Sequence, residues 1–98
     1  MRAVLLALHY QNEVLHPEGR IRVGLQAGSP VRAAVIGAAE QLLAAARVRA
    51  IPVVHVRVAF RPDYADLRTN APIFRNVAAL GAVREGSWGA AFYDTLAP

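Results

Sequence analysis

Apolar residues follow one another along two short stretches of the chain, residues 2–8 (RAVLLAL) and residues 52–59 (PVVHVRVA). The first stretch shows no alternation of apolar and polar residues, a pattern typical of a strand that is buried on both faces of a parallel sheet. The second is short and rich in β-branched residues, which favours another strand. We therefore predict two strands, one at the start of the chain and one near its middle.

A long helix is predicted between these strands, over residues 29–49. Ser29 can cap the first backbone N–H groups, and Pro30 suits the first helical position. Arg47 and Arg49 complement the helix dipole at the other end. Apolar residues recur at spacings of three and four, which predicts one buried stripe: Val31, Val35, Ala38, Ala39, Leu42, Leu43 and Ala46. Strand, helix and strand together form a βαβ unit.

The remaining segments carry weaker patterns. Residues 10–28 mix polar residues, a proline and glycines, which predicts a long loop, and Ile73–Leu80 is expected to form a short helix. The predicted fold class is α/β, part of a doubly wound (Rossmann-like) parallel sheet sandwich, with the βαβ unit followed by an irregular segment. Residues 1–98 are interpreted as the N-terminal portion of a single domain.

Composition narrows the function classes. With 55% hydrophobic and 18% charged residues the chain reads as globular, and it contains no cysteine. Its net charge of +4 comes from arginine alone, and the arginines are spread from Arg2 to Arg84 rather than clustered, so no nucleic-acid partner is expected. The apolar run in residues 3–8 is too short for a signal peptide or a membrane span. We expect a cytoplasmic protein without a membrane partner.

Four stretches resemble the isochorismatase-like cysteine hydrolases. Residues 3–15 (AVLLALHYQNEVL) are similar to the family's opening strand, which runs into an Asp-Met-Gln-Asn-Asp-Phe motif. HPEGRI follows directly. Residues 45–63 (AARVRAIPVVHVRVAFRPD) resemble the family's second passage from helix to strand, and residues 86–98 (GSWGAAFYDTLAP) resemble its Gly-rich turn.

The resemblance implies a doubly wound α/β sandwich that hydrolyses small amides with an Asp, a Lys and a Cys nucleophile. His9 stands at the position of the Asp. An acid–base group beside a thiol can take its proton and pass it to a leaving amine, so His9 is the candidate catalytic residue. The alternative is a neutral structural histidine in a protein that has lost the reaction. Lys and Cys occur nowhere in these 98 residues.

Substrate-binding candidates follow from the position of ligand sites in α/β sheets. Ligands bind beyond the carboxyl ends of the strands, which here precede residues 9–15 and 60–64. Gln11, Asn12, Phe60 and Arg61 are therefore expected to contact substrate, and Arg61 could pair with a substrate carboxylate. Trp88 is expected to line the pocket or an oligomer contact.

Metal and cofactor sites are not expected. His9, His16, His55 and Asp63 lack the spacing of a known metal signature, and His55 lies within a predicted strand. The spacing of Gly81, Gly86 and Gly89 somewhat resembles a phosphate loop, but no strand precedes these glycines and no Lys-Ser/Thr follows, so they predict a turn. A nucleotide-binding protein would also need a glycine-rich turn after the first strand.

Two functions stay open. The first is a hydrolase of small-molecule C–N (amide) bonds, active only when completed by a second half that carries Lys and Cys. The second is a non-catalytic protein of the same fold that serves self-association or partner binding. A separate physical problem bears on both: a strand that is apolar on both faces needs more cover than one helix and one further strand provide. We expect a homo-oligomer or a complementary chain to complete the sheet.

Overall fold

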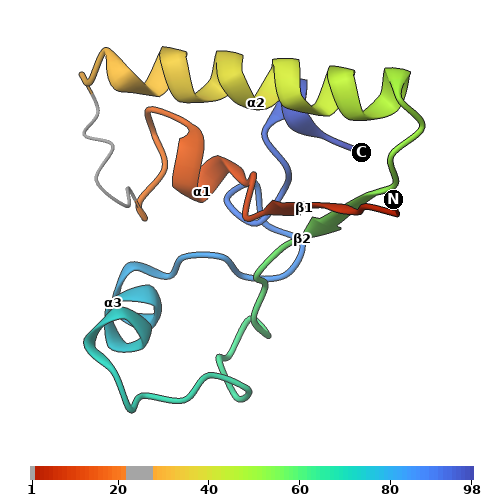
Figure 1. Ribbon diagram of the computed structural model, residues 1–98. Helices are drawn as coiled ribbons and strands as arrows, with labels where there is room; N and C mark the ends of the chain where they lie inside the picture. Colours follow the sequence, from red (N-terminus) through yellow and green to blue (C-terminus); the bar gives the residue numbers. More distant parts are fainter. Residues whose placement is uncertain (1, 22–27) are drawn as a thin grey trace.

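A computed structural model describes residues 2–21 and 28–98 (Figure 1). Its elements, in chain order, are strand β1 (Leu5–Leu8), helix α1 (Asn12–Leu15), helix α2 (Val31–Val48), strand β2 (Val53–Val56), helix α3 (Pro72–Leu80) and the 3₁₀ helix η1 (Asp94–Leu96). Helix α2 runs above the two strands, and α3 lies on the other side of them, at the end of the long connection that follows β2. None of the helices in the described part of the chain is long and apolar enough to cross a membrane.

The two strands form a parallel sheet, which confirms the predicted α/β class and the βαβ unit. Leu5 pairs with Val53 and Leu8 with Val56. Both strands are shorter than predicted because the backbone beyond them turns away from the sheet or forms hydrogen bonds outside it. The chain turns out of β1 at His9, whose φ is 61°, and after β2 the N–H group of Val58 donates to the side chain of Gln11 at 3.0 Å.

The first core cluster lies between the sheet, α2 and the C-terminal segment. Its buried members are Ala7, Leu15, Ala39, Leu43 and Leu96. Leu43 and Leu96 are almost inaccessible to solvent, at 2% and 0% relative exposure. The predicted stripe was therefore correct at Ala39, Leu43 and Ala46.

The same prediction was wrong at three large residues of α2. Val31, Val35 and Leu42 are 54%, 38% and 49% exposed, while Arg32 and Ile36 are buried in their place. An alanine-rich helix can carry two apolar stripes about 100° apart, and spacing alone does not say which one meets the sheet. Packing against β2 and η1 selects the stripe that contains Leu43.

The start of α2 agrees with its predicted signal to within one residue. The Oγ atom of Ser29 accepts a hydrogen bond from the N–H group of Val31 at 3.2 Å, as expected of a capping serine. The helix then ends at Val48, and the N–H group of Arg49 still donates to Ala45 O at 3.1 Å.

Residues 10–28 were predicted as a loop, and this prediction was wrong for α1. The N–H groups of Asn12 and Glu13 donate to the carbonyl groups of Ala91 and Gly89, each at 2.9 Å. A helix of four residues is not stable by itself, so these bonds to a distant segment allow it to form. No local pattern reveals them. The rest of the predicted loop includes residues 22–27, which lie outside the described residues.

Helix α3 confirms the short helix expected over Ile73–Leu80. It has Pro72 in its first turn and ends at Gly81, whose φ of 65° is the left-handed conformation that favours glycine at a helix C-terminus. A second core cluster joins Val77 of this helix to three buried residues of the segment that follows it, Ala82, Val83 and Ala90. The chain after Gly81 is irregular up to η1, as predicted.

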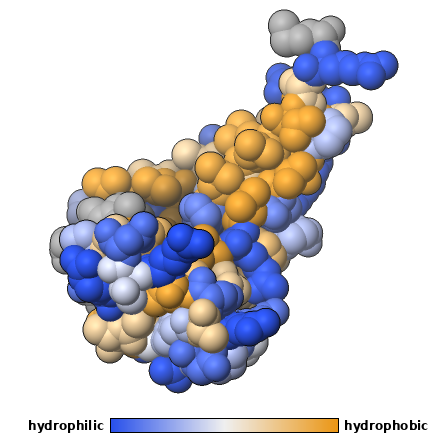
Figure 2. All heavy atoms as spheres, turned by 90° about the horizontal axis from the view of Figure 1, so that it is seen from below, coloured by the Kyte–Doolittle hydropathy of each residue, from blue (hydrophilic) through white to orange (hydrophobic). Residues whose placement is uncertain are grey.

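One face of the sheet has little cover from the described chain. Leu6, Leu8 and Val54 point to this face and are 56%, 51% and 46% exposed. Figure 2, which views the molecule from that side, shows a band of hydrophobic surface there. The sequence predicts that β1 is buried on both faces of the sheet. Among the described residues, only the face beneath α2 is packed.

Neighbouring leucines on α2 test which stripe carries the packing. Leu43→Ala should lower the free energy of unfolding by about 2–5 kcal/mol, because a buried leucine loses its contacts and leaves a cavity. Leu42→Ala, one residue away and half exposed, should change it by about 0.5 kcal/mol or less. Urea denaturation of both variants measures the difference. Equal losses would contradict the assignment of the buried stripe.

Candidate functional site

A pocket of about 380 Å³ lies beyond the carboxyl ends of both strands, between the sheet and α3. Its wall is mainly apolar and includes Val14, Val58, Phe60, Phe74, Val77 and Val83. This is the place where open α/β sheets bind ligands. A candidate substrate-binding residue is therefore expected to line this pocket.

His9 directly follows the last residue of β1 and lines the pocket. Its N–H group donates to Val56 O at 2.8 Å, and its φ of 61° turns the chain away from the sheet. The Nδ1 atom of the ring is buried and has no hydrogen-bond partner among the described residues. A buried imidazole nitrogen without a partner is costly, and a ligand in the pocket would remove that cost.

Gln11 also lines the pocket, but its side chain is fully engaged in holding the structure together. Its Nε2 atom donates to Val58 O at 2.7 Å and to Ala90 O at 2.8 Å. Its Oε1 atom accepts from the N–H group of Val58 at 3.0 Å. With both amide hydrogens in use, this residue ties the extension of β2 to the C-terminal segment.

Asn12 and Trp88 lie together, outside the pocket wall. The Nδ2 atom of Asn12, which is buried, donates to Trp88 O at 2.9 Å. The indole of Trp88 is half exposed, and the ring of His16 meets it edge-on with 4.8 Å between centroids. The structure therefore brings these two candidates together as a contact between α1 and the 86–90 turn.

Phe60 and Arg61 point in different directions although they are adjacent. Phe60 lines the pocket, and its N–H group donates to Val83 O at 2.9 Å. Arg61 is exposed and is not part of the pocket wall, while its N–H group donates to the Oδ1 atom of Asp66 at 3.0 Å. His9, Gln11 and Phe60 thus meet at one pocket, and their roles toward a substrate stay predictions.

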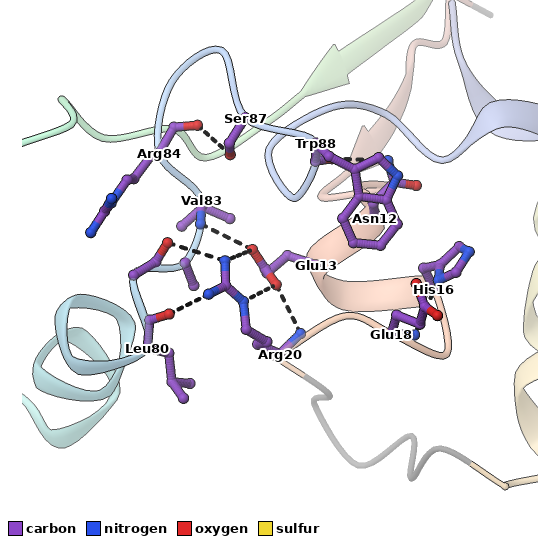
Figure 3. Close-up of polar contacts among 12 residues, drawn as sticks. Asn12, Glu13, His16, Glu18, Arg20, Leu80, Val83, Arg84, Ser87 and Trp88 are labelled. Carbon is purple, nitrogen blue, oxygen red and sulfur yellow. Dashed lines mark hydrogen bonds and ion pairs between the residues drawn. The ribbon is translucent and has the colours of Figure 1, made fainter.

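The residue that sequence reasoning missed is Glu13, whose buried carboxylate forms an ion pair with the half-exposed Arg20 (Figure 3). Its side chain is fully buried. The Oε1 atom accepts from the Arg20 backbone N–H at 2.8 Å and from Nε at 3.1 Å. The Oε2 atom accepts from Nη2 of Arg20 at 3.3 Å and from the N–H group of Val83 at 3.2 Å.

Arg20 extends this contact to the end of α3. Its Nη1 atom donates to Leu80 O, and its Nη2 atom donates to Gly81 O at 3.1 Å. The ion pair therefore links α1, the segment after it and the α3 C-terminus. A Glu and an Arg seven residues apart in a predicted loop gave no sequence signal for this link.

Two glycines make room for the glutamate. A Cβ atom on Gly89 would lie 1.9 Å from Glu13 Oε2, and one on Gly19 would lie 2.4 Å from Glu13 O. Any other residue at position 89 would displace a carboxylate that is held by four donated hydrogen bonds. The glycine pattern read from sequence as a turn thus also serves close packing around Glu13.

Val83 is held in a strained conformation beside the same carboxylate. Its φ is 46°, which is unusual for a β-branched residue and costs about 1–3 kcal/mol. Glu13 binds its N–H group and Phe60 binds its carbonyl group, while the side chain is buried in the pocket wall. These contacts fix a backbone geometry that the residue does not prefer.

The described residues contain no group of three or more His, Cys, Asp and Glu side chains placed to hold a metal ion. His55, which the sequence places within β2, packs its ring against Phe92 with 5.5 Å between centroids. Its Nδ1 atom is buried without a hydrogen-bond partner in the described chain.

Comparison with known proteins identifies one family. A family model described as the isochorismatase domain matches residues 3–98, almost the whole chain, in agreement with the resemblance read from the sequence. No curated protein matches the chain.

The charge of Glu13 should make folding stability depend on pH. Burial raises the pKa of this carboxyl, but the hydrogen bonds from Arg20 and Val83 and the charge of Arg20 outweigh it, so the pKa lies below its ordinary value of 4.5. A lowered pKa means that the contribution to stability is complete above the unfolded-state value and is lost as the pH falls below about 4.5.

Glu13→Gln tests this dependence. At pH 7 the variant should be less stable by about 1–3 kcal/mol, because a charged acceptor of several hydrogen bonds is lost. Between pH 5 and pH 3, an illustrative window around the ordinary carboxyl pKa, its stability should fall less steeply than that of the parent chain. Urea denaturation at several pH values gives both curves, with Glu18→Gln, an exposed site, as the matched control. Parallel curves for the parent and Glu13→Gln would contradict the role assigned to this carboxylate.

Proposed function

Because the chain belongs to the isochorismatase domain family, we propose that it forms part of a hydrolase that cleaves C–N bonds of small amides. A second half of the protein, in a further stretch of sequence or in a separate chain, would supply the Cys nucleophile and the Lys. The observation that supports this proposal is the position of His9, at the carboxyl end of β1 and in the pocket wall, with an unpaired buried Nδ1 atom among the described residues.

His9 would act as the acid–base group in two steps. It takes the proton of the thiol, the thiolate attacks the amide carbon, and the C–N bond breaks as His9 returns the proton to the leaving amine. In the second step His9 takes a proton from water as the water oxygen attacks the thioester carbon. The C–S bond then breaks as His9 returns that proton to the sulfur, and the acid and the free thiol are released. Gln11 and Phe60 hold the shape of the pocket in this scheme.

The open face of the sheet favours a second candidate function, a non-catalytic protein of this fold that associates with itself or with a partner. Leu6, Leu8 and Val54 offer an apolar surface that water solvates poorly. A second copy or a partner chain that covers it would also complete the sheet. The two candidates differ in whether a second half bearing Cys and Lys, in a further stretch of sequence or in a separate chain, is needed.

Activity of the completed protein tests the hydrolase proposal. With the second half present, His9→Ala should lower kcat for a small amide by about 10²–10⁴, the usual contribution of a general acid–base. His9→Asp should keep a large part of the activity, because the family resemblance places an Asp there. His16→Ala, which removes a ring outside the pocket, is the control. Release of ammonia or amine measures turnover.

The 98-residue chain alone should show no hydrolysis, since it contains neither Cys nor Lys. Full activity in His9→Ala, or activity that survives alkylation of all thiols, would contradict the proposal. Intact and native masses of the purified protein separate the candidates further. A single 98-residue species that forms a dimer, and becomes a monomer in Leu6→Arg, would support self-association instead.

A further inference from the structure

The hydrogen bonds between β1 and β2 continue beyond the paired residues through a side chain. At the end of the sheet the N–H group of His9 donates to Val56 O at 2.8 Å. The next bond comes from the Nε2 atom of Gln11, which donates to Val58 O at 2.7 Å with the same offset of 47 positions between donor and acceptor. A regular parallel ladder would place the backbone N–H group of Gln11 on that carbonyl group.

The carboxamide of Gln11 also takes the place of a backbone acceptor. In a continued ladder the N–H group of Val58 would donate to His9 O. It donates instead to the Oε1 atom of Gln11 at 3.0 Å. One donor and one acceptor of the side chain thus meet both backbone groups of Val58, so the carboxamide stands where a peptide group of β1 would otherwise lie.

This replacement allows the backbone to leave the sheet at His9 while Val58 keeps its hydrogen bonds. The φ of His9 is 61°, in the left-handed region that residues other than glycine rarely adopt. The backbone of Gln11 then forms an antiparallel bridge with Phe92 of the C-terminal segment. The backbone of Gln11 therefore belongs to one ladder and its side chain to another.

The carboxamide is held tightly at this branch point. Gln11 is 1% exposed, and its Nε2 atom uses its second hydrogen on Ala90 O at 2.8 Å. If the side chain moved away, the backbone groups of Val58 and Ala90 would lose partners in a partly buried region, which is costly. The three hydrogen bonds therefore favour the turn at His9 over a straight continuation of β1.

The turn at His9 decides where its ring lies. In a straight strand residue 9 would share the face of Ala7, which is buried beneath α2, because side chains two residues apart point the same way. The pocket lies on the opposite side, where Leu8 contributes to its wall. A left-handed φ at His9 instead brings this residue into the same wall.

From these contacts we propose that Gln11 is a positioning residue, which holds the turn at His9 and thereby keeps the imidazole at the pocket. The inference rests on the proposed hydrolase function, because Gln11 would act on the acid–base step through His9. It differs from the sequence expectation that Gln11 contacts substrate, since both of its amide hydrogens are in use. The contacts that support it are all formed within this chain, so a second half of the protein is not needed to make them.

Gln11→Glu tests this role by changing one heavy atom. It places a carboxylate oxygen where Nε2 donates, so two hydrogen bonds become repulsive contacts with Val58 O and Ala90 O. Asn12→Asp is the matched control, because it makes the same change in the neighbouring buried carboxamide, which donates to Trp88 O at 2.9 Å. Gln11→Met removes the bonds without adding a charge, so the test does not depend on the folding of Gln11→Glu alone.

NMR spectroscopy of the 98-residue chain measures the position of the His9 ring. The nuclear Overhauser contacts between this ring and the pocket wall should be lost in both Gln11 variants, because the backbone at His9 is free to extend. They should be kept in Asn12→Asp. A folded Gln11 variant that retains all contacts of the His9 ring would overturn the proposal.

Kinetics of the completed protein test whether Gln11 acts through His9. Gln11→Glu should lower kcat for a small amide by about 10²-fold, the usual cost of displacing a reacting group by about 1 Å. In the His9→Ala background the same substitution should cause no further loss, because the group that Gln11 positions is gone. An equal loss in both backgrounds would show that Gln11 acts independently of His9 and would overturn the proposal.

The two experiments separate failure of this inference from failure of the hydrolase proposal. If the His9 ring moves as expected but the completed protein hydrolyses no amide, the positioning of His9 by Gln11 stands and the hydrolase function is wrong. If the completed protein hydrolyses amides and the losses from Gln11→Glu and His9→Ala are independent, the function stands and the positioning role is wrong.

Discussion

The buried carboxylate of Glu13 is the constraint on which the arrangement of this chain depends. An ionised group removed from water must find several donors, or its burial would cost more than folding can offset. Here Arg20 and the backbone of Val83 provide them, and they come from segments 7 and 70 residues away along the chain. Satisfying one side chain therefore fixes the positions of α1, the α3 C-terminus and the segment that follows it.

This constraint shapes the pocket. Val83, whose N–H group binds Glu13, belongs to the pocket wall, and Gly89 lies so close to the carboxylate that it admits no Cβ atom. The strained φ of Val83 persists because hydrogen bonds hold both of its backbone polar groups. Gln11 adds a second tie between β2 and the C-terminal segment. The pocket at the end of the strands is thus set by buried polar contacts behind an apolar surface.

Local sequence patterns were sufficient to predict the elements whose own residues carry a clear signal, such as an apolar run or a helix cap. Apolar runs and a capping Ser29 predicted both strands and α2, and a short helix was expected over Ile73–Leu80. The family followed from the resemblance of residues 3–15 to a known motif. The local pattern did not decide which of the two apolar stripes on α2 is buried, because that depends on what packs against the helix.

Helix α1 and the Glu13–Arg20 pair were not predicted for the same reason, since their partners at residues 80–91 are distant in sequence. Of the candidate site residues, His9 was predicted from the family resemblance and Gln11 and Phe60 from the strand ends, and all three lie at the pocket. Asn12 and Arg61 follow from the strand-end rule and are not part of the pocket wall, and Trp88, expected there as a large apolar side chain, packs against His16 instead. The rule places a segment at the strand ends, but adjacent residues of that segment point in different directions.

The cost of replacing Gly89 tests most directly whether the Glu13 carboxylate organises this region. Gly89→Ala, measured by urea denaturation in the parent chain and again in Glu13→Ala, forms a double-mutant cycle. In the parent the added Cβ atom must displace the carboxylate, so the loss of stability should exceed the loss in Glu13→Ala by about 1 kcal/mol or more. The same loss in both backgrounds would show that Gly89 does not pack against a fixed carboxylate, and the account of this region would be contradicted.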